Sequence, residues 1–440
     1  MFEKYDAYKD SNNTELPNVP VGWKVDRIKY EIQLLTGYPF NSSKYSEEGI
    51  KLVRGINVKE SVLDWKDTAY WPEVTPDLQR YLLKDGDLLI GMDGSKVGKN
   101  FCQISEQDLP LLLLQRVARL RVKSFLNARY LYWNLASKRF LNWINKSKTD
   151  PMIPHMAPKD INDFVIAFPP VSEQEEIALF LDNKTSEIDQ AIALKEKQIA
   201  LLNERKQIII QKAVTQGLDS NVPMKDSGME WIGKIPEHWE ILKLKNLALV
   251  NPTNTTLANC LDKNTSVCFL AMENVETNGT VDYQNRRNLA SVKTGFTSFV
   301  KNDVLVAKIT PCFENGKGAL LDMLDTQIGF GSTEFHVLRV KQNCNPKFLY
   351  YVTKSHSFMD MGEGMMIGSA GQKRVPTSFI QNYVVAIPDK NAQAEIVNFI
   401  DQRLNEISEA INLQKQQIEK LKEYKTTLIN NAVTGKIKVA

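Results

Sequence analysis

The chain has 440 residues, of which 43% are hydrophobic and 24% charged, and its formal net charge is +3. This balance is ordinary for a globular protein and argues against a mostly disordered one, while the net charge neither demands nor excludes a nucleic-acid partner. The densest apolar run, residues 109–114, is far shorter than the roughly 18 residues that cross a bilayer, and the first residues lack an apolar signal core. We therefore expect neither a membrane protein nor a secreted one, and we place the chain in the cytoplasm.

The first 170 residues are expected to mix short strands, turns and helices. Residues 87–92 are mostly apolar and end at the pair Asp93-Gly94, which predicts a short strand followed by a turn. The next residues, 94–100, are rich in glycine and lysine but have the wrong spacing for a nucleotide-binding phosphate loop. They are interpreted either as a basic flexible loop near DNA or as a plain surface turn. Residues 128–137 predict a helix.

A long helix is predicted to begin after Pro169 and Pro170 and to cover residues 171–217. Ser172 and Glu175 have the spacing of a capping box. The apolar residues then repeat every seven positions in two series, which is the pattern of a coiled coil. One series is Leu181, Ile188, Leu202 and Ile209, and the other is Ile192, Ile199 and Ala213. About forty residues at about 1.5 Å each would make a rod of roughly 60 Å.

The second half of the chain repeats the first. Short motifs recur in the same order and at nearly the same separation along the chain. The matched pairs are residues 9–11 and 225–227, 20–23 and 236–239, 87–89 and 303–305, 121–123 and 339–341, 127–133 and 345–351, and 164–169 and 383–388. The strongest match joins residues 174–215 to residues 393–434, so the second half has a long helix of its own. The chain is therefore an internal duplication.

Two helices of equal length in one chain favour pairing with each other. If they pair antiparallel, the two mixed parts lie at opposite ends of the rod, related by a pseudo-two-fold axis; a coil between two chains is the alternative. Polar residues interrupt the heptad series at matching places, Lys195 with Gln414 and Lys206 with Lys425. These positions are interpreted either as fixing the register at some cost in stability or as lying where the seam meets solvent or a partner.

The sequence contains no pattern that predicts catalysis by this chain alone. It has no phosphate-binding loop motif, no glycine-rich dinucleotide or methyl-donor fingerprint after a strand, and no nucleophile elbow. The four histidines lack metal-ligand spacing and the five cysteines form no C-x-x-C pair, which argues against a zinc site and a disulfide framework. The excess of positive charge lies in the two mixed parts and not in the long helices, as a pair of DNA-binding domains would need.

Several segments resemble the specificity subunits of type I restriction–modification systems. They match the start of the family's second recognition domain, its central conserved region and its distal one, and comprise residues 225–239, residues 170–177 with 213–217, and residues 393–396 with 432–436. The resemblance covers essentially the whole chain, and the arrangement in two copies is far more specific than any single motif. Local departures occur at Ala392 and in residues 12–16.

The resemblance implies an α+β fold: two mixed α/β target recognition domains separated by two long helices that form an antiparallel coiled coil. We predict a first recognition domain over residues 1–170, a central conserved helix over 171–217, a second recognition domain over 218–389 and a distal conserved helix over 390–440. Each recognition domain would read one half of a bipartite, asymmetric DNA site. The helices would set the spacer and dock methyltransferase subunits.

The same resemblance implies a non-catalytic subunit with several partners. These are double-stranded DNA, two modification subunits that methylate adenine, and restriction subunits that translocate and cleave DNA. S-adenosylmethionine, ATP and Mg²⁺ are expected on those partners, and no cofactor on this chain. The helix surfaces outside the seam and the turns at Trp23 and Trp239 are candidates for docking the modification subunits. Four apolar residues near the helix ends are expected to be half exposed in the isolated chain: Ile209, Ile210, Leu428 and Ile429.

The predicted rod suits a split DNA site. Two half-sites read from one face of B-DNA lie about one helical turn apart, roughly 34–36 Å, and a rod of roughly 60 Å can set that separation even when tilted. The two recognition domains differ in sequence, so the half-sites should differ as well. Two other classes of protein stay open at this point: a stand-alone DNA-binding regulator on the same scaffold, and a purely structural coiled-coil adaptor.

Contacts to DNA are predicted in two irregular stretches of each recognition domain, where basic and amide side chains could reach phosphates or base edges. In the first domain they are Ser95, Lys96, Lys99 and Asn100, and then Lys146, Lys148 and His155. In the second domain they are Lys308, Asn315 and Lys317, and then Gln372, Lys373 and Arg374. A solvated surface side chain is the alternative for each. Three tryptophans are interpreted as core residues and not as base-stacking ones: Trp71, Trp133 and Trp143.

Overall fold

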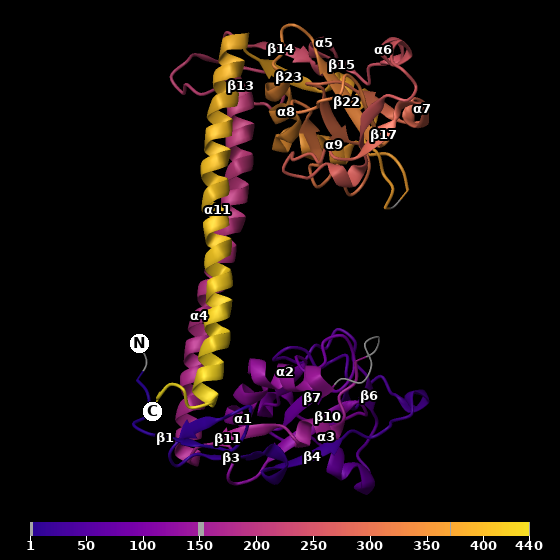
Figure 1. Cartoon of the computed structure of the whole chain (residues 1–440). Helices are drawn as coiled ribbons and strands as arrows, with labels where there is room; N and C mark the ends of the chain where they lie inside the picture. The colour runs from indigo at the N-terminus through magenta and orange to yellow at the C-terminus, as the bar shows by residue number, and fades with distance from the viewer. Residues whose placement is uncertain (1–2, 148–153, 370, 440) are drawn as a thin grey trace. The chain divides into compact units, whose positions relative to one another are not determined.

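The computed structural model describes residues 3–147, 154–369 and 371–439 (Figure 1). The chain folds into two compact units, one formed by Met1–Lys195 with Lys415–Ala440 and the other by Glu196–Gln414. Each unit combines one mixed α/β part with a portion of both long helices, so the expected α+β class and the internal duplication are confirmed. No helix in the described part of the chain is long and apolar enough to span a bilayer.

The first unit is built on a four-stranded antiparallel sheet in the order β4-β10-β7-β8. Its strands are β4 (Ile32–Thr36), β7 (Leu88–Gly91), β8 (Phe101–Gln103) and β10 (Val117–Val122). Strand β7 is buried at every position, which explains why its sequence is continuously apolar instead of alternating. This is the strand predicted over residues 87–92.

Smaller elements surround the sheet of the first unit. A three-stranded sheet contains β6 (Tyr70–Trp71), β5 (Ile50–Val53) and β9 (Leu111–Leu113), with β5 and β9 parallel. The remaining strand pairs are β1 (Tyr8–Asp10) with β2 (Asn18–Pro20), and β3 (Lys24–Arg27) with β11 (Val165–Phe168). The helices are α1 (Ala128–Leu135), α2 (Lys138–Ser147) and α3 (Pro158–Asn162), and 3-10 turns cover Ile28–Tyr30, Ser42–Lys44, Pro76–Tyr81 and Glu106–Asp108. The helix predicted over residues 128–137 thus ends earlier, and a second helix follows it directly.

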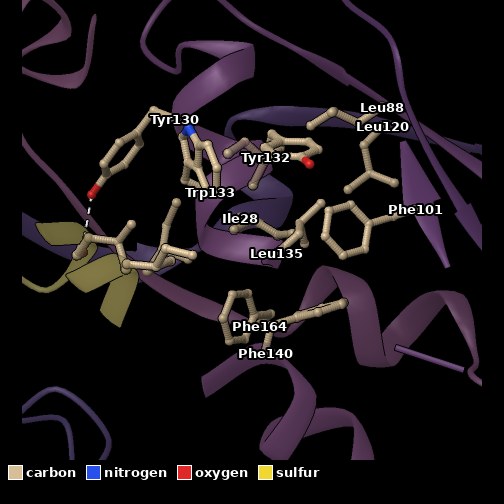
Figure 2. Packing of buried hydrophobic residues seen from close by; sticks show 14 of the residues in the cluster. Ile28, Leu88, Phe101, Leu120, Tyr130, Tyr132, Trp133, Leu135, Phe140 and Phe164 are labelled. Carbon is tan, nitrogen blue, oxygen red and sulfur yellow. Dashed lines mark hydrogen bonds between the residues drawn. The ribbon is translucent and has the colours of Figure 1, made fainter. Parts of the chain in front are cut away.

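Helix α1 contributes Tyr130, Tyr132, Trp133 and Leu135 to the core of the first unit (Figure 2). Tyr130 is fully buried, and its hydroxyl donates to the carbonyl of Ala167 at 2.8 Å. Trp133 is buried, while Trp143 and Trp71 are partly buried against apolar clusters. The interpretation of these three tryptophans as core residues is confirmed.

The second unit repeats this plan with a sheet in the order β15-β22-β19-β20. Its strands are β15 (Ala248–Val250), β19 (Val304–Ala307), β20 (Gly318–Leu320) and β22 (Phe335–Val340). A second sheet contains β17 (Arg286–Asn288), β16 (Ser266–Leu270), β21 (Gly329–Gly331) and β18 (Thr297–Phe299). The other pairs are β12 (Met224–Asp226) with β13 (Lys234–Pro236), and β14 (Glu240–Lys243) with β23 (Val384–Ile387). The short helices are α5 (Leu244–Leu247), α6 (Thr255–Cys260), α7 (Leu289–Val292), α8 (Pro346–Lys354), α9 (His356–Gly364) and α10 (Thr377–Asn382), and a 3-10 turn covers Met272–Asn274.

Each main sheet is fastened by the same ion pair. Arg121 on β10 places Nε and Nη2 at 2.7 Å from the two oxygens of Asp87. Arg339 on β22 does the same to Asp303, at 2.8 and 2.7 Å. Both carboxylates are almost fully buried and also accept a backbone N–H at 2.8 Å. The repeated Asp and Arg motifs of the sequence are therefore structural.

The two long helices are α4 (Val171–Gln216), with 46 residues, and α11 (Lys390–Val433), with 44. They lie side by side and antiparallel within each unit (Figure 1). In the first unit Lys425 of α11 donates to Asp189 of α4 at 2.6 Å, and Lys195 of α4 donates to Gln417. In the second unit Lys206 donates to Ser408 at 2.8 Å. Because three of the polar residues in the seam bond across to the other helix, they favour the interpretation that such residues fix the register.

The start of each long helix is fixed by a buried glutamine. Gln174 accepts the backbone N–H of Asn127 at 2.8 Å, and its amide donates to the carbonyl of Pro169 at 2.9 Å. Gln393 makes the corresponding bonds to Asn345 and Pro388 at 2.7 and 2.9 Å. This pair of bonds explains why the glutamine recurs at the head of both helices.

The end of each long helix packs on one of the repeated tryptophan turns. The Cα of Gly435, after α11, lies so close to Trp23 and Pro20 that a β-carbon there would clash, and Gly217, after α4, has Trp239 as its neighbour. The side chains of Trp23 and Trp239 are buried at these contacts, so only the rims of the two turns are left as docking candidates. Ile210, Leu428 and Ile429 are also buried here, which corrects the expectation of half exposure; Ile209 is half-buried as expected. Local sequence could not show this, because the covering residues come from the distant end of the chain.

Candidate nucleic-acid interface

The two predicted stretches of the first unit meet at one edge of its main sheet. The backbone N–H of Met156 donates to Met92 O at 2.9 Å, and that of Gly94 donates to Pro154 O at 3.1 Å. Asp93 and His155 form a β-bridge. The loop that follows β7 is therefore attached to the segment that precedes α3, although some sixty positions of sequence separate them. The residues around this junction are called edge 1: residues 92–100, 114–116 and 154–156.

Edge 1 presents most of its predicted side chains to solvent. Ser95, Lys96 and Lys99 are exposed, and Asn100 is half-buried with no hydrogen-bond partner for its buried Oδ1 within the described residues. Lys96 forms an ion pair with Glu60 at 3.2 Å, both side chains being more than half exposed. Such a pair is weak in water, so the ammonium of Lys96 can exchange this carboxylate for a phosphate at little cost.

The other predicted residues of the first unit divide between two places. The imidazole of His155 lies on edge 1, hydrogen-bonded through Nδ1 to Oδ1 of Asp93. Lys146, at the end of α2, instead pairs with Glu15 at 3.1 Å, a residue of the N-terminal segment outside edge 1. Lys148 lies outside the described residues.

The second unit has an equivalent junction. Val375 N–H donates to Lys308 O at 2.8 Å, and Thr310 N–H to Lys373 O at 3.0 Å. These bonds attach the loop after β19 to the segment before α10. The residues around the junction are called edge 2: residues 251, 308–317, 333–334 and 372–375. All six residues predicted to touch DNA in the second domain lie in it.

The predicted residues of edge 2 differ in how free their side chains are. Gln372, Lys373 and Asn315 are exposed. The ammonium groups of Lys308 and Lys317 are already engaged, donating to Thr333 O at 2.8 Å and Met272 O at 3.0 Å. Burial lowers the pKa of Lys308, so this lysine is the less suited of the two to an exposed phosphate contact.

Arg374 is also engaged within edge 2. Its Nε and Nη2 lie 3.0 and 2.8 Å from the two oxygens of Glu334, which is a bidentate pair. Its Nη1 also donates to Gln372 O, at 3.4 Å. Because Nε and Nη2 are occupied by the carboxylate, Arg374 can offer a bidentate pair of donors to DNA only after leaving Glu334. Glu334 was not predicted by the sequence, since its role depends on a contact with a residue forty positions away.

A buried histidine on the main sheet forms hydrogen bonds to two segments of edge 2. His336 on β22 is 1% exposed; its Nε2 lies 3.0 Å from Val375 O, and its Nδ1 lies 3.3 Å from the amide nitrogen of Asn251. Burial lowers the pKa of His336 to about 4, so the ring is neutral at pH 7 and can donate to one group while accepting from the other. This residue thereby connects the segment before α10 and the turn at Asn251 to β22.

Asn251, which sequence reasoning missed, opens onto a cavity of about 480 Å³. The cavity is also lined by Asn254, Lys293, Phe296 and Lys308. An amide, an ammonium and an exposed aromatic ring in one hollow are the groups that contact nucleotides. Asn251 has a positive φ of 53°, a property of the folded turn that the sequence alone does not predict.

Metal-ligating side chains do not gather in the part of the chain that the structure describes, where no three His, Cys, Asp or Glu residues are grouped as a metal site would need. What the two edges do offer is a set of exposed cationic, amide and carboxylate groups on backbone that is tied to a sheet. Such groups suit recognition of a polar surface.

A family model described as the type I restriction modification DNA specificity domain matches residues 20–204 and again 236–422. Over 463 aligned residues the chain is 25% identical to the type I restriction enzyme MjaVIII specificity subunit of Methanocaldococcus jannaschii, covering 98% of this chain and 97% of that one. It is 39% identical to the EcoEI specificity subunit of Escherichia coli over 167 residues, which cover 37% of this chain and only 27% of the relative.

Solved structures share the fold. A chain from a structure of type I R-M system assembly and conformational transition has a TM-score of 0.71 at 14% identity, covering 94% of this chain and 98% of that one. The HsdS subunit from Thermoanaerobacter tengcongensis has a TM-score of 0.56 at 13% identity, with coverages of 95% and 98%. At these identities the similarity shows the fold alone.

Proposed function

Because the chain belongs to the family of type I restriction modification DNA specificity domains, we propose that it is the DNA-specificity subunit of a type I restriction–modification complex. Each unit would read one half of a bipartite, asymmetric DNA site through its edge. The observation that carries this proposal is the pair of edges 1 and 2, which the duplication places at equivalent positions of two sheets but equips with different side chains. Equivalent position supports a shared role, and different side chains support different half-sites.

The chemistry of the edges fits recognition of duplex DNA. The exposed lysines, such as Lys99 and Lys373, suit phosphate contacts that are independent of sequence. Amide and guanidinium groups at the same edges suit base-edge contacts in the major groove. We propose that the helices set the number of unread base pairs between the half-sites, because antiparallel α4 and α11 join in each unit to the core that supports its edge.

In this proposal the chain is non-catalytic and works with partner subunits in the cytoplasm. Two modification subunits would methylate adenine with S-adenosylmethionine, and restriction subunits would use ATP and Mg²⁺; those cofactors are assigned to the partners and none to this chain. Exposed leucines on the long helices support docking of a partner there, since large apolar side chains on a surface commonly mark interaction sites. They are Leu194 and Leu201 on α4 and Leu413 on α11.

Single-molecule sequencing of genomic methylation, with and without the gene for this chain, tests the proposal. We expect deletion to remove one bipartite adenine-methylated motif with two different halves, and re-expression of the chain to restore it. Because a silent system would also show no change, the modification subunit is co-expressed from a plasmid in both strains. If the methylated motifs are then the same with and without the chain, the proposal is wrong.

A further inference from the structure

Arg116 of edge 1 occupies an unusual backbone position. It lies in the turn between β9 and β10 with a φ of +68°, in the left-handed region that bulky residues rarely adopt. Its own carbonyl accepts the N–H of Met92 at 3.0 Å, and the N–H of Gln115 beside it donates to Tyr38 O at 3.0 Å. A residue is held in such a conformation only when the surrounding structure determines it, and this is most common at functional sites.

A glycine behind the turn keeps Arg116 in place. A β-carbon on Gly37 would lie 2.1 Å from both the carbonyl carbon and oxygen of Leu114. The N–H of Gly37 also donates to Val117 O at 3.1 Å. The turn is therefore packed directly against the end of β4, which fixes the point from which the arginine side chain leaves the backbone.

The guanidinium of Arg116 is supported on one side and open on the other. Its Nε lies 3.4 Å from Oδ2 of Asp93, while Oδ1 of the same carboxylate bonds to His155. The carboxylate is thus held by two neighbours. Among the described residues, neither terminal nitrogen of Arg116 has a hydrogen-bond partner, and the side chain is 72% exposed. The paired Nη1 and Nη2 donors are therefore available to a ligand.

The neighbouring carboxylate indicates which ligand fits. A phosphate approaching Arg116 would be repelled by Asp93, so a backbone contact is disfavoured. A G·C base pair instead offers O6 and N7 of guanine as two acceptors for the guanidinium fork, and the N4 amino group of cytosine as a donor for a carboxylate. The pair of side chains thus matches both partners of one base pair.

We propose that Arg116 is a specificity-determining residue that reads a guanine in the first half-site, and that Asp93 positions it and accepts from the paired cytosine. This inference rests on the proposed function of the chain as a DNA-specificity subunit. It goes further because it assigns one base pair of the target to two named side chains.

Edge 2 differs at the same positions. The strand registers align Arg116 with Glu334, since Arg121 and Arg339 occupy the same place in the two sheets. Here the acidic group stands on the turn, and Arg374 uses Nε and Nη2 to hold both of its oxygens. The second edge therefore has no open arginine fork at this position, and the second half-site should lack a guanine read in this way.

The first test uses the full chain with its modification partner in cells. We expect Arg116→Ala to relax one guanine of one half of the methylated motif while the other half and the spacer stay unchanged. The matched control is Lys99→Ala, an exposed cation on the same edge. It should lower methylation evenly without relaxing any position. A motif that stays strict at every guanine in Arg116→Ala overturns the inference, as does a motif with no G·C pair in either half.

The second test covers an Arg116→Ala chain that fails to support methylation. Binding of the assembled complex is measured on duplexes in which each guanine is replaced in turn by 7-deazaguanine, which lacks the N7 acceptor. The wild-type complex should lose about 2- to 13-fold in affinity at one guanine, half of the free energy of a bidentate contact, because O6 is kept. The Arg116→Ala complex should lose nothing further at that position, and equal losses in both would overturn the inference. If the wild-type complex binds no DNA sequence selectively, the proposed function itself fails.

Discussion

The two units can be compared position by position, because the bond from Met156 to Met92 in one has its counterpart between Val375 and Lys308 in the other. Away from the edges the two units are alike: both main sheets contain the buried Asp–Arg pair, and both long helices begin with the buried glutamine. At the edges they differ, with Arg116 open in one and Arg374 closed on Glu334 in the other. Interactions that hold the fold have been kept through the duplication, while the groups that would face a ligand have changed.

Because the main sheets of the two units are alike, breaking either buried ion pair should lower the free energy of unfolding by the same large amount. Asp87→Ala and Asp303→Ala each leave an arginine without its buried partner, and we expect each to lower the free energy of unfolding by roughly 3 kcal/mol. Urea denaturation of the single variants measures this. Asp189→Ala is the control, since that carboxylate is 57% exposed and should cost less than about 1 kcal/mol. A loss in only one of the two aspartate variants would break the comparison.

The edges should differ in their response to acid. His336 has a folded pKa lowered to about 4 by burial, against an ordinary value of about 6.5. Its neutral form is therefore favoured by folding. The stability it supports is complete above pH 6.5, and it falls as pH drops towards 4, where the unfolded chain binds the extra proton. We expect this to cost the second unit on the order of 2 kcal/mol.

The first unit has Ala118 at the place of His336, as the strand registers show. Hydrogen exchange at pH 7 and pH 4.5 can follow each unit separately. The backbone amides of β22 should lose protection more than those of β10, and His336→Gln should remove most of that difference. Equal losses in the two strands would contradict this account of the histidine.

A third difference lies in how closely the turn of edge 1 is packed. Gly37→Ala would place a β-carbon against Leu114, and we expect a loss of about 1–2 kcal/mol because the strand end must move. The matched position in the second unit is Thr253, which is exposed, so Thr253→Ala should change stability by less than about 0.5 kcal/mol. Thermal unfolding of both variants compares them, and equal shifts would show that edge 1 is no more rigid than edge 2.

The smallest effects on stability are expected at the exposed lysines. Lys96→Ala and Lys373→Ala should each change the free energy of unfolding by less than about 0.5 kcal/mol. Each should also weaken DNA binding by the assembled complex and reduce the dependence of log affinity on log salt by about 1 if it removes one phosphate contact. Titrations at several salt concentrations measure the slope. An unchanged slope would remove that lysine from the interface.

Much of the fold could be predicted from the sequence because it depends on local or repeated patterns. The heptad repeats predicted the long helices, the apolar run predicted β7, and the order of the motifs predicted the duplication. The edges were predicted only in part. Their loops are rich in polar residues, but which side chains are free depends on pairings between distant segments. Lys317 is tied to Met272, and Arg374 to Glu334, while Arg116 becomes available through the φ of a turn.

The central claim is that each unit specifies one half of the target independently. It is tested most directly by a chain in which residues 1–170 are replaced by a second copy of residues 218–389, expressed with the modification partner in cells lacking the natural chain. Sequencing of methylated adenines should then reveal a palindromic bipartite motif, with both halves equal to the second half of the natural one. A methylated motif that still has two different halves would contradict the account.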